Sequence, residues 1–299
     1  MDPESVRGLC NVRPPTTVRF LSMLQGLQSI IRRRSGSGKV TEITGSETKI
    51  PSEPEQTGVY LLQNDIITGN EVGTRTYEVD IVAVHGLNGT AMGTWTGAKV
   101  EQQSHRATKR LWLKDFLYKD FPGARVFTYK YPSHLFFSKS KGTTDDYAEK
   151  LLLGLRSHRV GQERRPIIFI AHSLGGIVCK KALVLASEDS DYTALLESTV
   201  GILFFGTPHS GVAGTPDIVM MVGSIIDTLS RISGPRWLRG KIRKDLLAGL
   251  KTGSSDLRHT TKRFGLLLRK RKIRIISIFE TKEQPPFGRL VSNIKLRPC

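Results

Sequence analysis

Ser173, in the stretch IIFIAHSLGG, is the residue of this chain best placed to do covalent chemistry. A serine hydroxyl becomes a nucleophile when it is exposed on a turn, has a base beside it and faces donors for a developing oxyanion. A sharp strand–serine–helix turn needs small residues two places before and two places after the serine. Ala171 and Gly175 meet that need, with alanine where glycine is more common. The stretch therefore predicts a nucleophile elbow, whose further members are His172 and Gly176.

Two backbone amides are expected to face the oxyanion. One is that of Leu174, because it opens a helix whose free N–H groups and dipole favour negative charge. The other should come from the loop after an earlier strand. The segment VHGLNGT at 84–90 fits that place, so we assign the second donor to Leu87. His85 and Gly86 belong to the same oxyanion loop, and we expect His85 to be structural there rather than the general base.

The elements that must position these residues alternate along the chain between strands and helices. Apolar runs predict buried strands at 76–84, 124–131, 167–171, 199–205 and 273–279. Helical patterns are found at 111–118, from the threonine pair at 143–144 to 158, at 174–185, and two or three times within 215–268. Such alternation is typical of a mostly parallel α/β sheet covered by helices on both faces.

Taken together, several blocks of the chain resemble one family. In order they read HGLNG, TW, WLKDFL, RVFTYKYPS, IIFIAHSLGG, GILFFGTPHSG and ISIFET, and they span about residues 77–291. This order is similar to that of the serine esterase and lipase-like family, which includes the serine active site-containing proteins and the N-terminal domains of many fungal NACHT proteins. The resemblance implies an α/β-hydrolase fold with a mostly parallel central sheet, and an acyl ester, lipid in kind, as substrate. No cofactor and no metal are expected.

In that fold the catalytic triad follows the chain order serine, acid, histidine. Glu280, at the end of the strand IRIISIF, is the expected acid, and Asp217 and Asp256 are the alternatives. None of the seven histidines follows Glu280, and the strand that begins at 290 is not completed before Cys299, so we expect a truncated C-terminal end. His209, in GTPHSG, is the histidine that could substitute as the base.

The net charge of +18 is concentrated at the two ends of the chain. Residues 231–299 carry 19 Lys and Arg against 4 Asp and Glu, and residues 1–40 carry 7 against 2. Basic ends favour contact with an anionic surface such as a membrane. The run at 269–272 lies between a helix and a strand, so we expect it to be exposed. No nucleic acid is expected as a partner, because no stacking aromatics or reading motif accompany the basic residues.

The first 58 residues read as a basic leader and flexible linker, followed by the hydrolase domain at 59–299. The leader has apolar residues at helical spacing, several arginines and few acids. That composition fits a mitochondrial presequence, a helix on a membrane surface or a disordered segment. Three distant cysteines argue against a disulfide scaffold or a zinc site and favour a reducing compartment. By resemblance we expect association with the mitochondrion or endoplasmic reticulum membrane, with a cytoplasmic location as the alternative.

Two functions follow from these features. The first is a serine acyl hydrolase in which Ser173 attacks a carboxylic ester, inactive in this chain if no histidine serves as base. The alternative is a hydrolase-fold domain without catalysis, acting as an interaction module or a membrane-associated sensor. The apolar stretch 217–232 fits either a lid over the site or an ordinary buried helix. The sequence does not indicate an oligomeric state.

Overall fold

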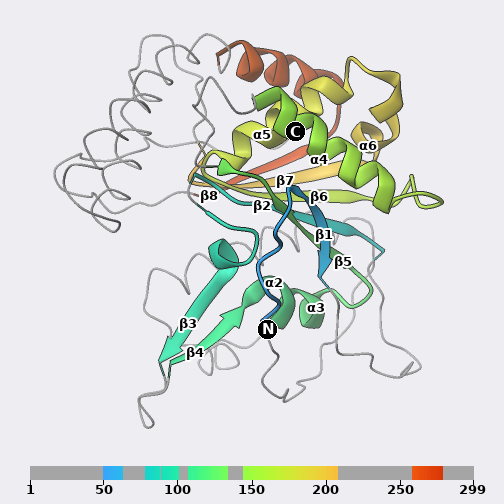
Figure 1. The fold of residues 1–299 in the computed structure, drawn as a ribbon. Helices are drawn as coiled ribbons and strands as arrows, with labels where there is room; N and C mark the ends of the chain where they lie inside the picture. The colour runs from blue at the N-terminus through green and yellow to red at the C-terminus, as the bar shows by residue number, and fades with distance from the viewer. Residues whose placement is uncertain are drawn as a thin grey trace, which may run out of the picture.

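A six-stranded sheet forms the centre of the computed structural model, in the order β1-β5-β2-β6-β7-β8 (Figure 1). The structure describes residues 50–62, 78–87, 89–100, 107–133, 144–207 and 258–278. The strands are β1 (Gly58–Leu62), β2 (Asp80–Val84), β5 (Arg125–Lys130), β6 (Ile167–His172), β7 (Thr199–Phe205) and β8 (Arg274–Ile278). All pairs are parallel except β1 with β5, so the one antiparallel strand lies at an edge.

The central strands are buried on both faces, which explains their continuous apolar runs. All five residues of β2 are buried. Side chains alternate between the faces along each strand. Val82 and Val84 therefore join one hydrophobic core cluster, whereas Ile81 and Ala83 join the other.

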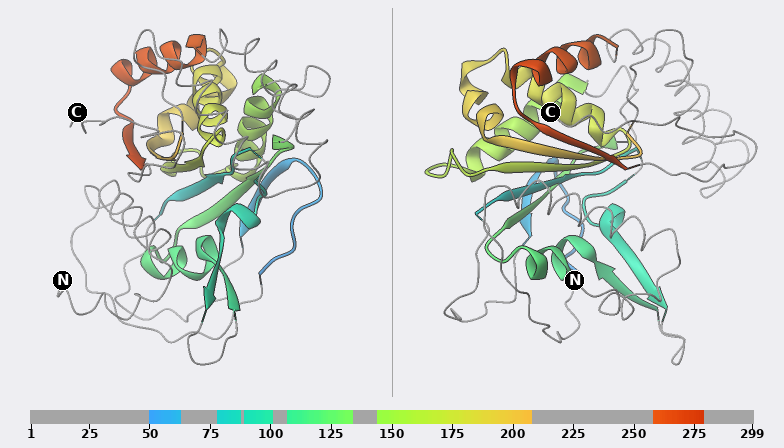
Figure 2. Two further views of the ribbon diagram at one scale, coloured as in Figure 1. Left: turned by 90° about the vertical axis from the view of Figure 1, so that its left-hand side faces the viewer. Right: turned by 180° about the vertical axis from the view of Figure 1, so that it is seen from behind.

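Different elements cover the two faces (Figure 2). One face packs against α4 (Thr144–His158), α5 (Gly175–Ala186), α6 (Thr193–Ser198) and a helix over 258–270, which contribute Leu151, Ile177, Leu195 and Phe264 to its core. The other face packs against α2 (Trp112–Asp115), α3 (Leu117–Asp120) and the short helix η3 (Gly93–Trp95). The hairpin of β3 (Thr96–Val100) and β4 (Ala107–Leu111) extends from this side, and η5 (Ser190–Tyr192) precedes α6.

This architecture confirms the predicted α/β-hydrolase fold class, a mostly parallel central sheet flanked by helices. The helix expected at 111–118 is wrong in its bounds. Leu111 ends β4, and the helical part is divided into α2 and α3 because Phe116, with φ −119°, departs from helical backbone angles. The edge strand β1 and the β3–β4 hairpin are additions to the predicted elements. The expected truncation at the C-terminal end, residues 217–232 and the leader at 1–40 lie outside the described residues.

The parallel strands give the sheet two chemically different edges. The carboxyl ends of β2, β6 and β7 lead into the oxyanion loop, Ser173 and Thr207 respectively. The amino ends carry buried Asp80 and the arginines around it. No helix in the described part of the chain is both long and apolar enough to span a bilayer.

Candidate active site

Ser173 occupies the turn between β6 and α5 with a left-handed backbone, φ 51°. It is the only non-glycine residue with positive φ among those described. Such a conformation is uncommon for serine and persists only where the surroundings fix it. Here the Ser173 N–H donates to Phe205 O at 2.7 Å, and the Gly176 N–H donates to Ser173 O at 3.1 Å. The turn is thus held from β7 on one side and from α5 on the other.

The small residues of the elbow are needed because backbones approach closely there. A Cβ added to Gly175 would lie 2.5 Å from Val84 O and closer still to His85 O, so any side chain would push α5 away from β2. A Cβ on Gly86 would lie 2.8 Å from the Ser173 Cβ. The oxyanion loop therefore rests directly against the serine. Gly176 packs in the same way against the Thr207 side chain.

The turn predicts an exposed hydroxyl, but among the described residues Ser173 is buried, with only 4% of the residue exposed. Its Oγ has no hydrogen-bond partner among them. Thr207 Oγ1, after β7, is buried and unpartnered in the same part of the chain. A buried hydroxyl without a partner is unfavourable by about 1–3 kcal/mol. Native proteins rarely keep such groups without a catalytic or other functional reason.

The two amides assigned to the oxyanion flank the serine in the fold. Leu174 follows it and precedes the first turn of α5, with helical φ −63°. Leu87 follows β2, in the loop whose Gly86 touches Ser173. Neither amide donates to an acceptor within the described segments. Their role as oxyanion donors stays a prediction.

His85 is built into the oxyanion loop as a structural residue. Its Nδ1–H donates to Gly86 O at 3.0 Å, and its Nε2 accepts the Tyr131 N–H at 3.4 Å. The Tyr131 ring stacks on the imidazole at 4.4 Å, and the Tyr131 hydroxyl donates to His85 O at 2.8 Å. Burial lowers the pKa of His85 to about 4. Burial and these contacts favour a neutral ring with both nitrogens engaged, which fits the structural role expected for His85.

The chain directly after the oxyanion loop is anchored by residues that no motif in the sequence marks. The Glu53 carboxylate accepts the N–H groups of Ala91 at 2.6 Å and Met92 at 3.0 Å. Thr128, on β5, donates its hydroxyl to Ala91 O at 2.7 Å. Glu53 lies in the stretch expected to be linker, and no local pattern marks it. Only the fold brings it to a loop nearly forty residues away.

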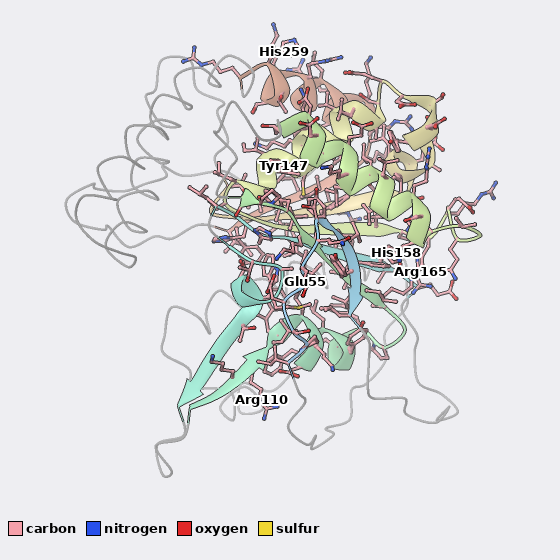
Figure 3. The ribbon with its side chains drawn as sticks, viewed as in Figure 1. Glu55, Arg110, Tyr147, His158, Arg165 and His259 are labelled. Atoms are coloured by element: carbon pink, nitrogen blue, oxygen red, sulfur yellow. The ribbon has the colours of Figure 1, made fainter. Side chains whose placement is uncertain are left out.

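The described residues bring Ser173 together with Gly86 and Leu174, and no described acid or base is hydrogen-bonded to its hydroxyl. Glu280, Asp217, Asp256 and His209 lie outside the described residues. His158, the last residue of α4, hydrogen-bonds through Nε2 to Val59 O. His259 is exposed on the helix over 258–270 (Figure 3). Of the predicted site, the structure therefore describes the elbow and the oxyanion loop.

Comparison with known proteins finds relatives for part of the chain. The chain is 33% identical over 171 residues to the protein SERAC1 of Danio rerio and 30% identical over 171 residues to that of Homo sapiens. These alignments cover 52% and 53% of this chain, but only 25% of each relative. No family model matches. The expected resemblance to fungal NACHT proteins receives no support and stays a prediction.

Solved structures with low similarity include several hydrolases. A marine microorganism esterase matches with TM-score 0.33 and 11% identity, covering 75% of this chain and 92% of that one. The α/β-hydrolase enzyme MGS-MChE2, from a lagoon-sediment metagenome, matches with TM-score 0.35 and 13% identity over 77% and 88%. The monoacylglycerol lipase of Paleococcus ferrophilus matches with TM-score 0.33 and 13% identity over 78% and 94%. Likenesses at this level say nothing about the reaction of this chain.

Proposed function

We propose that the chain is a serine acyl hydrolase in which Ser173 is the nucleophile. The observation that carries the proposal is the left-handed backbone of Ser173, just before α5, together with its buried hydroxyl, which has no partner among the described residues. A strained serine between a buried strand and a helix is the arrangement that serine hydrolases use to present the hydroxyl. A purely structural serine at this position would gain by a hydrogen bond and would need no strain.

In the proposed reaction the Ser173 Oγ attacks the acyl carbon of an ester and its proton passes to a base. The carbonyl oxygen becomes an oxyanion, which accepts hydrogen bonds from the amides of Leu87 and Leu174. Collapse of the intermediate releases the alcohol, and water then cleaves the acyl-serine. Glu280 stays the proposed acid, with Asp217 and Asp256 as alternatives. His209 is the candidate base, since it follows β7 by four residues.

The substrate class proposed is a carboxylic ester with a lipid acyl group. Support comes from the resemblance of the motif blocks to serine esterases and from the similarity to SERAC1. Because the chain spans about a quarter of those relatives, their complete activity is not carried over. Association with a mitochondrial or endoplasmic reticulum membrane is proposed on the resemblance alone, with a cytoplasmic location as the alternative.

Labelling with a fluorophosphonate probe and hydrolysis of a short-chain aryl ester test the proposal. The wild-type chain should be labelled and should turn over the ester, and Ser173→Ala should lose all labelling and roughly 10³-fold or more of the rate. The control is Ser187→Ala, which removes an exposed serine just after the opposite end of α5 and should change neither readout.

The opposite result selects the alternative function. If the wild-type chain takes no label and its ester hydrolysis equals that of Ser173→Ala, the chain is a hydrolase-fold interaction or sensor domain. If labelling persists in Ser173→Ala, another residue is the nucleophile and the assignment of the elbow is wrong. A positive result would next be tested with His209→Gln, which should reduce the rate if His209 is the base.

A further inference from the structure

The helix over 258–270 has one face that the core does not use. Thr260, Phe264 and Leu267 are buried, and Phe264 and Leu267 pack into the core cluster beside α4 and α5. The positions between them face outward and include exposed lysines and arginines. Figures 1 and 2 show this helix, coloured orange-red, at the outside of the helical layer. Its outward face is therefore open surface within the described structure.

That outward face is cationic with one large apolar side chain at its centre. Leu266 is 49% exposed. Its neighbours three and four places away are Lys262, Arg263, Arg269 and Lys270, all exposed. On a helix such residues surround the central one. Residues 258–278 contain eight Lys and Arg and no Asp or Glu, so no acidic residue of this segment offsets the charge.

Two of the lysines and arginines at 258–272 form ion pairs with residues near α5 and on α6, and the others form none among the described residues. Arg263 forms an ion pair with Glu188, and Arg271 lies 3.5 Å from Glu197. By contrast Arg258, Lys262, Arg269, Lys270 and Lys272 have no ion-pair partner among the residues described. The unpaired set is gathered on the face that holds Leu266 and at the end of the helix.

We propose that this face, which we call the 258–272 face, binds the surface of a membrane that contains anionic phospholipids. Lysine and arginine near such a surface are attracted to the headgroups, and their long aliphatic stems let the charge stay at the phosphate level. An exposed leucine among them can enter the boundary between headgroups and acyl chains. A phosphate backbone of nucleic acid would match the charges, but it offers no place for Leu266, and no aromatic residue on this face could stack on bases.

The geometry separates this surface from the candidate active site. The helix leads directly into the amino end of β8, so Arg269–Lys272 lie at the edge of the sheet opposite to Ser173. A bilayer on the 258–272 face would lie over the helical layer and not over the carboxyl edge of the strands. Membrane binding and ester hydrolysis are therefore measurable independently, and the proposal does not rest on the proposed reaction.

Co-sedimentation of the full chain with phosphatidylcholine vesicles, with and without phosphatidylserine, tests the proposal. The wild-type chain should bind only the vesicles that contain phosphatidylserine. The double variant K262Q/K270Q should bind roughly 25-fold more weakly, since each cation near such a surface contributes about fivefold. L266S should also bind more weakly, and it should do so without a change in charge. The matched control K150Q/R164Q removes two exposed cations elsewhere and should bind more tightly than K262Q/K270Q.

A second readout follows the leucine itself. In L266W the new indole should be quenched by brominated acyl chains in vesicles that contain phosphatidylserine, and not in vesicles of phosphatidylcholine alone. The proposal is overturned if K262Q/K270Q binds as tightly as K150Q/R164Q, since other basic segments would then hold the vesicle. It is also overturned if L266S binds like the wild type and the indole is not quenched. The face would then recognise a polyanion such as nucleic acid by charge alone.

Discussion

Two side chains at the carboxyl edge of the sheet, those of His85 and Ser173, differ in whether their polar atoms have hydrogen-bond partners. The His85 ring has a partner for each nitrogen and lies against Tyr131. The Ser173 hydroxyl has none among the described residues, although it is equally withdrawn from water. At this scale the two groups differ in how far the described residues satisfy them, and that difference is what motivates the proposed role of Ser173.

His85 should make the stability of the protein fall at mildly acidic pH. Burial lowers the pKa of His85 from 6.5 in the unfolded chain to about 4 in the folded state. Between these two pH values the unfolded chain is protonated at His85 and the folded chain is not, so acidification favours unfolding. The contribution of His85 to the free energy of unfolding is complete above the unfolded pKa and is lost as the pH falls toward the folded pKa. Between pH about 7 and pH about 5 this amounts to about 2 kcal/mol of unfolding free energy.

Urea unfolding of the wild type and His85→Asn at both pH values measures this contribution. Asparagine can keep one hydrogen bond to the loop but cannot titrate. The variant should be less stable at neutral pH, and its loss of stability on acidification should be smaller than that of the wild type. Equal losses in the two proteins would show that His85 is not the group that titrates.

At the scale of elements, α5 owes its position to glycine. Gly175 lets the first turn of the helix approach the carbonyls of Val84 and His85 at the end of β2. This contact joins the element that carries the nucleophile to the element that carries the oxyanion loop. Gly265, in the middle of the helix over 258–270, has nothing within 4 Å of the place where its Cβ would be.

The same substitution at these two glycines should therefore have effects of opposite sign. Gly175→Ala should lower the free energy of unfolding by about 1–3 kcal/mol, because backbone atoms must move to admit the methyl group. Gly265→Ala should raise it by about 0.5–1 kcal/mol, since alanine is the better helix former and meets no obstacle. Thermal or urea unfolding of the two single variants measures both. A destabilised Gly265→Ala would contradict the open surface on which the 258–272 face depends.

The sequence is a good guide to elements that are buried on both faces and a poor guide to the others. The strand expected at 199–205 is β7 with the same bounds, and α5 differs from its expected range by one residue at each end. Apolar runs signal these elements directly. The β3–β4 hairpin reads TGAKV and ATKRL, which has neither an apolar run nor strict alternation. Its pairing is a tertiary outcome that composition does not signal.

The candidate site also divides into parts that the sequence signals locally and parts that only the fold brings together. The elbow and the oxyanion loop are local motifs that the sequence shows directly, and the structure brings them into contact at Gly86 and Ser173. The roles assigned to these residues stay predictions. Glu53, which fixes the loop from a distant segment, could not be predicted because its significance arises only when the chain is folded.

At the scale of the whole molecule, the amino edge of the sheet is organised around one buried carboxylate. Asp80 is completely buried at the start of β2. Arg125 from β5 donates to both of its oxygens at 2.7 Å, and Arg159, after α4, pairs with Oδ2. Arg165, before β6, lies 2.9 Å from Oδ1. The carboxylate thus joins two neighbouring strands to the segment that connects α4 with β6.

Replacing Asp80 by asparagine should therefore destabilise the entire domain. The change keeps the volume but leaves three guanidinium groups close together without a counter-charge, and breaking a buried pair in this way costs about 3–5 kcal/mol. The matched control is Asp191→Asn, which removes the carboxylate from an exposed pair with Arg156 and should cost less than about 1 kcal/mol. Urea unfolding of the two variants makes the comparison. If Asp80→Asn were as mild as Asp191→Asn, the amino edge would be held by its apolar core alone. Because the Asp80 cluster and Ser173 lie at opposite edges, Asp80→Asn should reduce stability and leave fluorophosphonate labelling of the remaining folded protein unchanged.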